Sequence, residues 1–104
     1  MKNPFGGGGQ GNLLQQMKKM QEQLKVAQKE LEKETVTASS GGGAVQVTMS
    51  GTQVCRSVEI KPELAISGDH EMLQRLILTS VNQALEQSRK LAAKKLGPLS
   101  GGLG

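Results

Sequence analysis

The first regular pattern of hydrophobic and polar positions along the chain has a helical period and spans residues 12–34. Gln, Lys, Glu, Leu and Met dominate this stretch, and neither Gly nor Pro interrupts it. Its apolar positions recur at intervals that alternate between four and three residues: Leu13, Met17, Met20, Leu24, Ala27 and Leu31. This spacing predicts a long helix with one apolar seam, and Asn12 is placed to cap its start. Because the seam is short for an independent coiled coil, packing on a sheet or a second helix is favoured over a zipper.

The middle of the chain changes to a period of two, which is typical of half-buried strands. Residues 35–40 are rich in β-forming types, and residues 45–50 and 54–60 alternate apolar with polar side chains. Gly41–Gly43 separates the first two runs, and glycine adopts the positive φ that a reversal needs. Ser50-Gly51-Thr52 predicts a tight hairpin between the second and third runs. The expected result is a three-stranded antiparallel meander.

A second helical pattern follows Pro62, which ends the third strand. Asp69 is placed to cap the new helix, and apolar positions at helical spacing continue to about residue 96. The pair Gly97-Pro98 predicts its end. The fold class is therefore α+β, with a long N-terminal helix, a three-stranded antiparallel meander and a long C-terminal helix.

The patterned region forms one expected domain, residues 12–96. A glycine-rich segment precedes it at residues 1–11, and the sequence GPLSGGLG follows it at residues 97–104. Glycine-rich chain ends are poorly ordered unless other contacts hold them, so both segments are expected to be flexible.

Composition limits how large a core this domain can build. Among 104 residues there is one aromatic side chain, Phe5, and there is no Trp or Tyr. Aliphatic and Met side chains bury less area each than aromatic ones, and a domain of this size is marginal as a monomer. We therefore expect a homodimer with apolar contacts from the sheet and the second helix, extended by the seam of the first helix.

The sequence contains few residues that could support catalysis or bind a cofactor. Cys55 and His70 are the only residues of their types; no third group is placed to orient them, and together they are too few for a structural zinc site. Gly41–Gly43 is not followed by the Gly-Lys-Ser/Thr of a phosphate-binding loop. We expect no catalytic residue, metal, cofactor or small-molecule substrate, and hence no enzyme. A single cysteine fits a reducing cytoplasm, and no apolar run approaches the ~20 residues that span a membrane.

Charge is distributed unevenly along the chain, whose net charge is +4. Residues 1–29 have a balance of +4, residues 30–86 of −4 and residues 87–104 of +4. The helix dipole favours cations at the end of the second helix but not in the first half of the first. A phosphate-binding surface accounts for both clusters if the fold brings them together. The candidate DNA-binding residues are Lys18, Lys19, Lys25, Arg89, Lys90, Lys94 and Lys95.

Several separate motifs resemble the YbaB/EbfC family of nucleoid-associated proteins. They are GNLLQQMKKMQEQL after a Gly-rich start, SGGGAVQVTMSG, CRSVEIKPEL and DHEMLQRLILTSVNQALEQSRK. The resemblance covers residues 5–97. It implies a homodimer whose paired helices project like the arms of tweezers and bind double-stranded DNA with little sequence preference. It also implies a cytoplasmic location at the nucleoid, where the protein alters DNA conformation, organises the nucleoid and influences gene expression.

A protein-interaction module remains the alternative, with a lysine-rich helix on an acidic partner. The scarcity of aromatic side chains argues against base stacking and single-strand recognition. The mode of nucleic-acid binding that remains is contact with phosphates, which does not depend on the base sequence.

Overall fold

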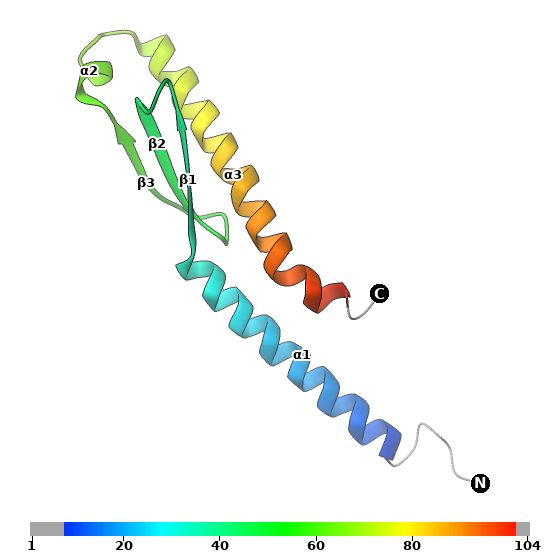
Figure 1. Ribbon diagram of the computed structural model, residues 1–104. Helices are drawn as coiled ribbons and strands as arrows, with labels where there is room; N and C mark the ends of the chain where they lie inside the picture. The colour runs from blue at the N-terminus through cyan, green and yellow to red at the C-terminus, as the bar shows by residue number, and fades with distance from the viewer. Residues whose placement is uncertain (1–7, 102–104) are drawn as a thin grey trace.

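The computed structural model describes residues 8–101 as six elements in chain order (Figure 1). They are α1 (Gly8–Lys33), β1 (Thr35–Ser40), β2 (Val45–Ser50), β3 (Cys55–Ile60), α2 (Pro62–Ala65) and α3 (His70–Gly101). This order confirms the α+β helix–meander–helix prediction and adds a short helix that starts at Pro62. The molecule measures 80 × 20 × 16 Å with a radius of gyration of 21.5 Å. A compact domain of ~100 residues has a radius of gyration of about 13 Å, so this fold is strongly elongated.

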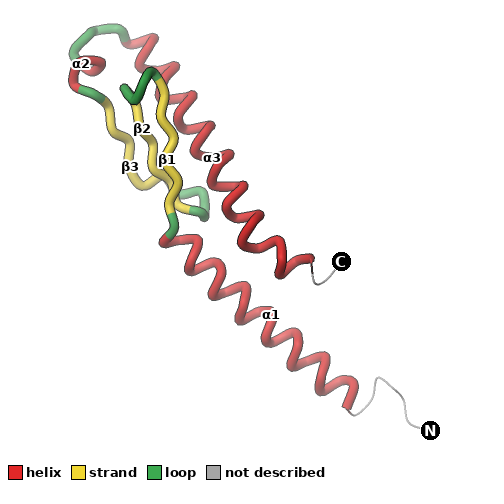
Figure 2. The backbone as a smooth tube through the Cα atoms, viewed as in Figure 1, coloured by secondary structure: helices red, strands yellow, loops and turns green. Residues whose placement is uncertain are grey.

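The sheet and α3 form a two-layered body. The strands are antiparallel in the order β1-β2-β3, and α3 runs along the face of β1 and β2. The C-terminal part of α1 lies beside the end of α3, and α1 then continues past that end, away from the sheet (Figure 2). The long axis of the molecule therefore comes from α1.

The core lies between α3 and the first two strands. Ala38, Val45, Val47, Met49 and Ala84 form its buried cluster. The side chains are small, and α3 turns a stripe of three small residues with no exposed surface toward the sheet: Ser80, Ala84 and Ser88. Their spacing of four residues keeps them on one face and lets the helix approach the strands closely.

The buried serines satisfy one another and the backbone. The Oγ atoms of Ser40 and Ser80 are 2.6 Å apart. Ser88 Oγ donates to the Ser50 carbonyl at 2.6 Å and accepts a hydrogen bond from Gln53 Nε2 at 2.9 Å. Buried hydroxyls without partners destabilise a core, so these pairs explain why polar side chains are tolerated there.

Glycine shapes both reversals of the meander. Gly41, Gly42 and Gly43 have φ values of +63°, +66° and +89°, which confirms the reversal predicted between β1 and β2. The hairpin between β2 and β3 is longer than the tight turn predicted, because Gly51 and the three residues after it form the loop. A bulge opposite Met49 accompanies it.

That longer loop follows from contact with the end of α1. A Cβ atom on Gly51 would lie 2.7 Å from Leu31 Cδ2, so only glycine fits there. The Gly51 N–H donates to the carbonyls of Leu31 and Glu34, and Arg56 Nη2 donates to the Glu32 carbonyl at 3.1 Å. The last carbonyls of a helix lack partners within it, so these three bonds cap α1 and join it to the sheet.

The boundaries of the two long helices partly correct the sequence analysis. Asp69 caps α3 as predicted, since its Oδ1 accepts a hydrogen bond from the Met72 N–H at 3.0 Å. The predicted stop at Gly97-Pro98 is wrong, because α3 continues to Gly101 with Pro98 inside it. Pro98 lies in the last turn of α3, where it costs the helix one backbone hydrogen bond, and it lines a groove shared with α1.

The start of α1 lies earlier than predicted. The helix begins at Gly8, so Asn12 lies inside it and is not its cap. Extending an existing helix is easier than nucleating one, and each glycine costs only about 1 kcal/mol. Residues 8–11 and 97–101 of the two terminal segments are thus helical, whereas residues 1–7 and 102–104 lie outside the described part.

Candidate nucleic-acid interface

The apolar seam of α1 divides into a buried half and an exposed half. Ala27 and Leu31 are 7% and 1% exposed, whereas Leu13 and Met17 are 54% and 52% exposed. We call residues 12–24 the arm, because most of their seam is exposed: only Met20 is half-buried. The predicted core-facing stripe is thus correct near the sheet and wrong along the arm. The spacing identifies the stripe, but the length of α3 decides how much of it is covered.

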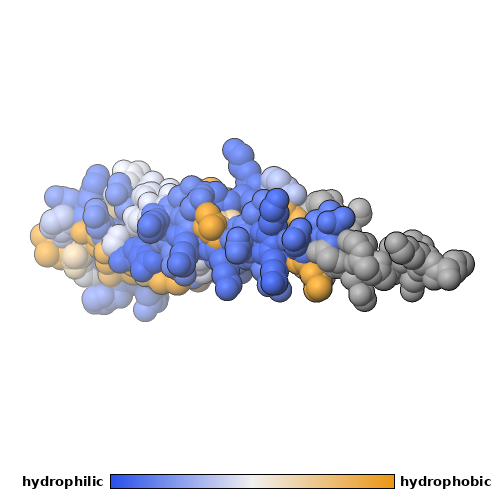
Figure 3. All heavy atoms as spheres, turned by 90° about the horizontal axis from the view of Figure 1, so that it is seen from below, coloured by the Kyte–Doolittle hydropathy of each residue, from blue (hydrophilic) through white to orange (hydrophobic). Residues whose placement is uncertain are grey.

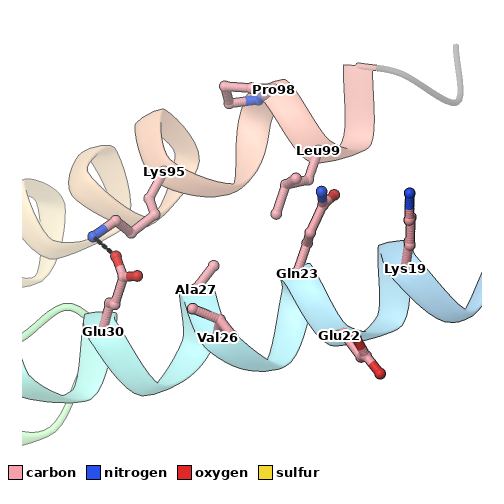
Figure 4. A pocket seen from close by; sticks show the side chains of 9 residues that line it. All are labelled: Lys19, Glu22, Gln23, Val26, Ala27, Glu30, Lys95, Pro98 and Leu99. Atoms are coloured by element: carbon pink, nitrogen blue, oxygen red, sulfur yellow. Dashed lines mark ion pairs between the residues drawn. The ribbon is translucent and has the colours of Figure 1, made fainter.

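The lysines of α1 are exposed and lie away from the seam. Lys18, Lys25 and Lys29 are spaced by seven and four residues, which places them on one helix face opposite the seam. Lys19 lies on the flank nearer α3 and points past the end of that helix (Figure 4). Lys29 was not among the residues selected from the sequence, although its spacing from Lys25 would have included it.

The basic residues of α3 lie along its last turns. Arg89, Lys90 and Lys94 are exposed. Lys90 Nζ lies 3.5 Å from Glu86 Oε1, but both side chains are largely exposed, so this ion pair restrains Lys90 little. The view in Figure 3 shows a mostly hydrophilic surface with small, separate apolar patches along the molecule.

A groove of about 640 Å³ lies between α1 and the end of α3 and brings members of the two basic clusters to one place. It is lined by Lys19, Glu22, Gln23, Val26, Ala27, Glu30, Lys95, Pro98 and Leu99. Lys19 and Lys95 therefore share its rim, although their helices are far apart in the sequence. The two side chains lie at opposite ends of the groove, and Lys95 points to Glu30 (Figure 4). The other basic side chains spread along both helices.

Lys95 differs from the other candidates because it is held by two carboxylates of α1. Its Nζ lies 2.7 Å from Glu30 Oε2 and 2.8 Å from Glu34 Oε1, and its side chain is 24% exposed. The hydrogen bond that Lys95 donates to Glu30, followed by the one it donates to Glu34, raises the pKa of Lys95 above its usual value. Figure 4 shows the ammonium reaching from α3 to Glu30. We call these three residues the Lys95 junction, since they join the two helices.

Four of the acidic residues outside this junction lie toward the opposite end of the molecule, whereas Glu22, Glu32 and Glu86 lie on the helices that carry the lysines. Glu59, Glu63 and Glu71 belong to β3, α2 and the start of α3, at the end remote from the arm (Figure 1). Lys61 and Arg75 lie among them and are exposed. The molecule thus has a basic end, formed by the arm and the last turns of α3, and an acidic end.

Cys55 and His70 do not form a site together. Cys55 starts β3 near the end of α1, and His70 starts α3 at the far end of the sheet, both of them exposed. Within residues 8–101, no group of three or more His, Cys, Asp or Glu could hold a metal ion. Nor does any helix in this part have the length and apolar character needed to cross a membrane.

The molecule belongs to the class of small α+β proteins with a helix–meander–helix body, and it carries exposed lysines on a projecting helix. The chain belongs to the YbaB/EbfC DNA-binding family, whose sequence profile matches residues 7–103. This confirms the family inferred from the sequence motifs.

Individual relatives and a solved structure agree with this family. A nucleoid-associated protein from Ruminiclostridium cellulolyticum is 42% identical over 94% of this chain and 85% of its own length. One from Desulforamulus reducens is 45% identical over 93% of this chain and 92% of its own. The crystal structure of an uncharacterized protein from Helicobacter pylori superposes with a TM-score of 0.67 at 26% identity, covering 90% of this chain and 92% of that one.

Proposed function

We propose that this protein is a nucleoid-associated protein that binds duplex DNA with little sequence preference through phosphate contacts from its basic end. The observation that carries the proposal is the separation of charge along the molecule: exposed lysines at the arm and the end of α3, and acidic residues at the opposite end. Such a field orients a protein on a polyanion and supplies sequence-independent affinity. The names of the relatives support the same function.

The phosphate contacts in this proposal come from side chains that are free to move. They are Lys18, Lys19, Lys25, Lys29, Arg89, Lys90 and Lys94. Lysine acts as a flexible point charge on phosphate oxygens and does not distinguish bases as a bidentate arginine does. Lys95 receives a different role, because Glu30 and Glu34 already hold its ammonium. It positions the end of α3 against α1, so that the two sets of cations stay at a fixed separation.

A homodimer completes the proposal. Val58 of β3 pairs across the sheet with the fully buried Val47 and shares its face, yet Val58 is 43% exposed because α3 covers only β1 and β2. Leu78 on α3 is 61% exposed as well. A second copy seated on these residues would bury them and present two arms, like the arms of tweezers. Each phosphate contact then occurs twice, and the bound protein acts in the cytoplasm at the nucleoid, on DNA conformation and gene expression.

The test is the salt dependence of binding to several unrelated duplexes. If about six phosphates are neutralised, the affinity falls roughly 10³-fold between 50 and 200 mM salt. Equal affinity for duplexes of different sequence, measured by fluorescence anisotropy with labelled DNA, supports contact with phosphates alone. A strong preference for one duplex contradicts the low sequence specificity. If the protein bound no duplex even at low salt, contact with an acidic partner protein would replace this proposal.

A further inference from the structure

We propose that the exposed seam of the arm pairs, in antiparallel orientation, with the arm of a second copy of this chain. The seam residues of the arm are Leu13, Met17, Met20 and Leu24. Leu13 and Met17 are about half exposed, Leu24 is 37% exposed, and Met20 is half-buried. The same seam is buried further along α1, where it meets α3 and the loop at Gly51. The arm thus continues, uncovered, a surface that already packs against protein.

The seam of the arm is complementary to itself when one copy is reversed. Its residues read Leu-Met-Met-Leu at intervals of four, three and four, so both the order and the spacing are palindromic. In an antiparallel pair centred between Lys18 and Lys19, Leu13 lies opposite Leu24 of the second copy, and Met17 lies opposite its Met20. Each layer then joins one a position to one d position, and a two-fold axis relates the copies.

The charges of the arm favour a second arm over other occupants. The positions that flank the seam are uncharged: Gln16, Gln21 and Gln23. Lys18 lies on the outer face and Lys19 on the flank nearer α3, so neither lies at the seam and two basic arms can meet there without placing like charges against each other. An anionic lipid surface would require lysines at the edge of the seam, where they could reach headgroups. An acidic protein would require the same, and neutral glutamines meet neither demand.

The short seam also sets when pairing occurs. Two heptads form a marginal interface, so free copies pair weakly in dilute solution. Copies held on one DNA molecule share a high effective concentration, which favours pairing without any new contact. The outward lysines remain available to phosphates. DNA binding is therefore cooperative, and arms of neighbouring copies link them along or between duplexes.

Cysteine pairs test the register directly, in full-length protein with Cys55→Ser as background. Met17→Cys and Met20→Cys chains are mixed at high concentration, with and without duplex DNA, and oxidised mildly. We expect about tenfold more mixed disulfide than for the outer-face control, Gln15→Cys with Glu22→Cys, because only the seam pair comes within disulfide reach. Like Met17 and Met20, the control positions Gln15 and Glu22 are placed symmetrically about the centre of the pair, but they lie on the outer face of the helix. Equal yields from the two pairs overturn the proposal.

Cooperativity supplies a second measurement. Met17→Gln with Met20→Gln keeps the charge and the helix but removes the apolar centre of the seam. We expect the affinity for a duplex that holds a single copy to change less than about twofold, since phosphate contacts are kept, while cooperativity on long DNA is lost. Unchanged cooperativity overturns the proposal. If wild-type protein bound no duplex, the proposed function would fail, yet the cysteine pairs would still decide arm pairing in the absence of DNA.

Discussion

The two halves of α1 have one sequence pattern and two environments. In the packed half, residues 25–33, the seam touches α3 and the loop at Gly51, and carbonyls at the helix end are capped by neighbouring elements. In the arm, the same seam spacing faces solvent. Both halves have lysines on their outer face. The comparison teaches that heptad spacing specifies a helix with an apolar side but does not specify which surface covers that side.

The two halves should also differ in what they contribute. The packed half stabilises the fold through buried contacts, and the arm contributes charge and binding surface. Matched substitutions in the two halves separate these contributions, because the residue types recur along the seam.

The largest expected effect is on stability, from truncating the same side chain in each half. Leu31→Ala removes a side chain that is 1% exposed, and we expect a loss of about 3 kcal/mol in the free energy of unfolding. Leu13→Ala, on the arm, is expected to change it by less than about 0.5 kcal/mol. Urea unfolding followed by circular dichroism measures both, since the chain has no Trp or Tyr to report by fluorescence. A similar loss from both variants would mean that the arm is buried in the free protein.

The next effect concerns DNA affinity. Lys18→Glu with Lys19→Glu removes two phosphate contacts from the arm and adds repulsion, so we expect about a 100-fold weaker affinity and a shallower salt slope. The matched control is Lys61→Glu with Arg75→Glu, which makes the same change in net charge at the acidic end. Fluorescence anisotropy with one duplex at fixed salt compares them. If the control weakened binding as much as the arm variant, net charge alone would govern affinity, and the separation between the two ends would not matter.

The sequence predicted the fold more completely than the site, for physical reasons. Periodicity and turn chemistry are local, so the strands, the glycine reversal and the Asp69 cap were identified from neighbouring residues. Contacts between distant segments could not be identified in this way, and the contacts of Gly51 with Leu31 and Glu34 explain why Gly51 belongs to a longer loop. The site shows the same division. Lys95 and Lys94 were assigned the same role from the sequence, because nothing local shows that Glu30 and Glu34 lie within reach of Lys95.

A smaller effect on stability is expected at the Lys95 junction. Lys95→Met keeps the aliphatic stem but leaves Glu30 and Glu34 without their shared cation. We expect a lower thermal midpoint than in wild type, with a decrease well below that of Leu31→Ala, because the junction is partly solvated. Lys94→Met is the matched control on the next position and should leave the midpoint unchanged. A decrease of equal size in both variants would show that the ion pairs add nothing beyond removal of a charge.

The smallest effect is the pH dependence of the same junction. Glu30 and Glu34 raise the pKa of Lys95 in the folded protein above 10.5, so folding favours its charged form. A lysine with a raised pKa contributes its full stability below the pKa of the unfolded chain and loses it as the pH rises through the folded value. We therefore expect the difference in stability between wild type and Lys95→Met to stay constant from pH 7 to about pH 9 and to shrink above about pH 10.5. Urea unfolding at a series of alkaline pH values measures this difference, and the absence of Tyr leaves fewer other groups titrating in that range.

The Lys94→Met protein provides the reference, because its own difference in stability from wild type should show no such decline. A difference for Lys95→Met that persists unchanged at pH 11 would show that its stem, and not its charge, holds the packed half of α1 against α3.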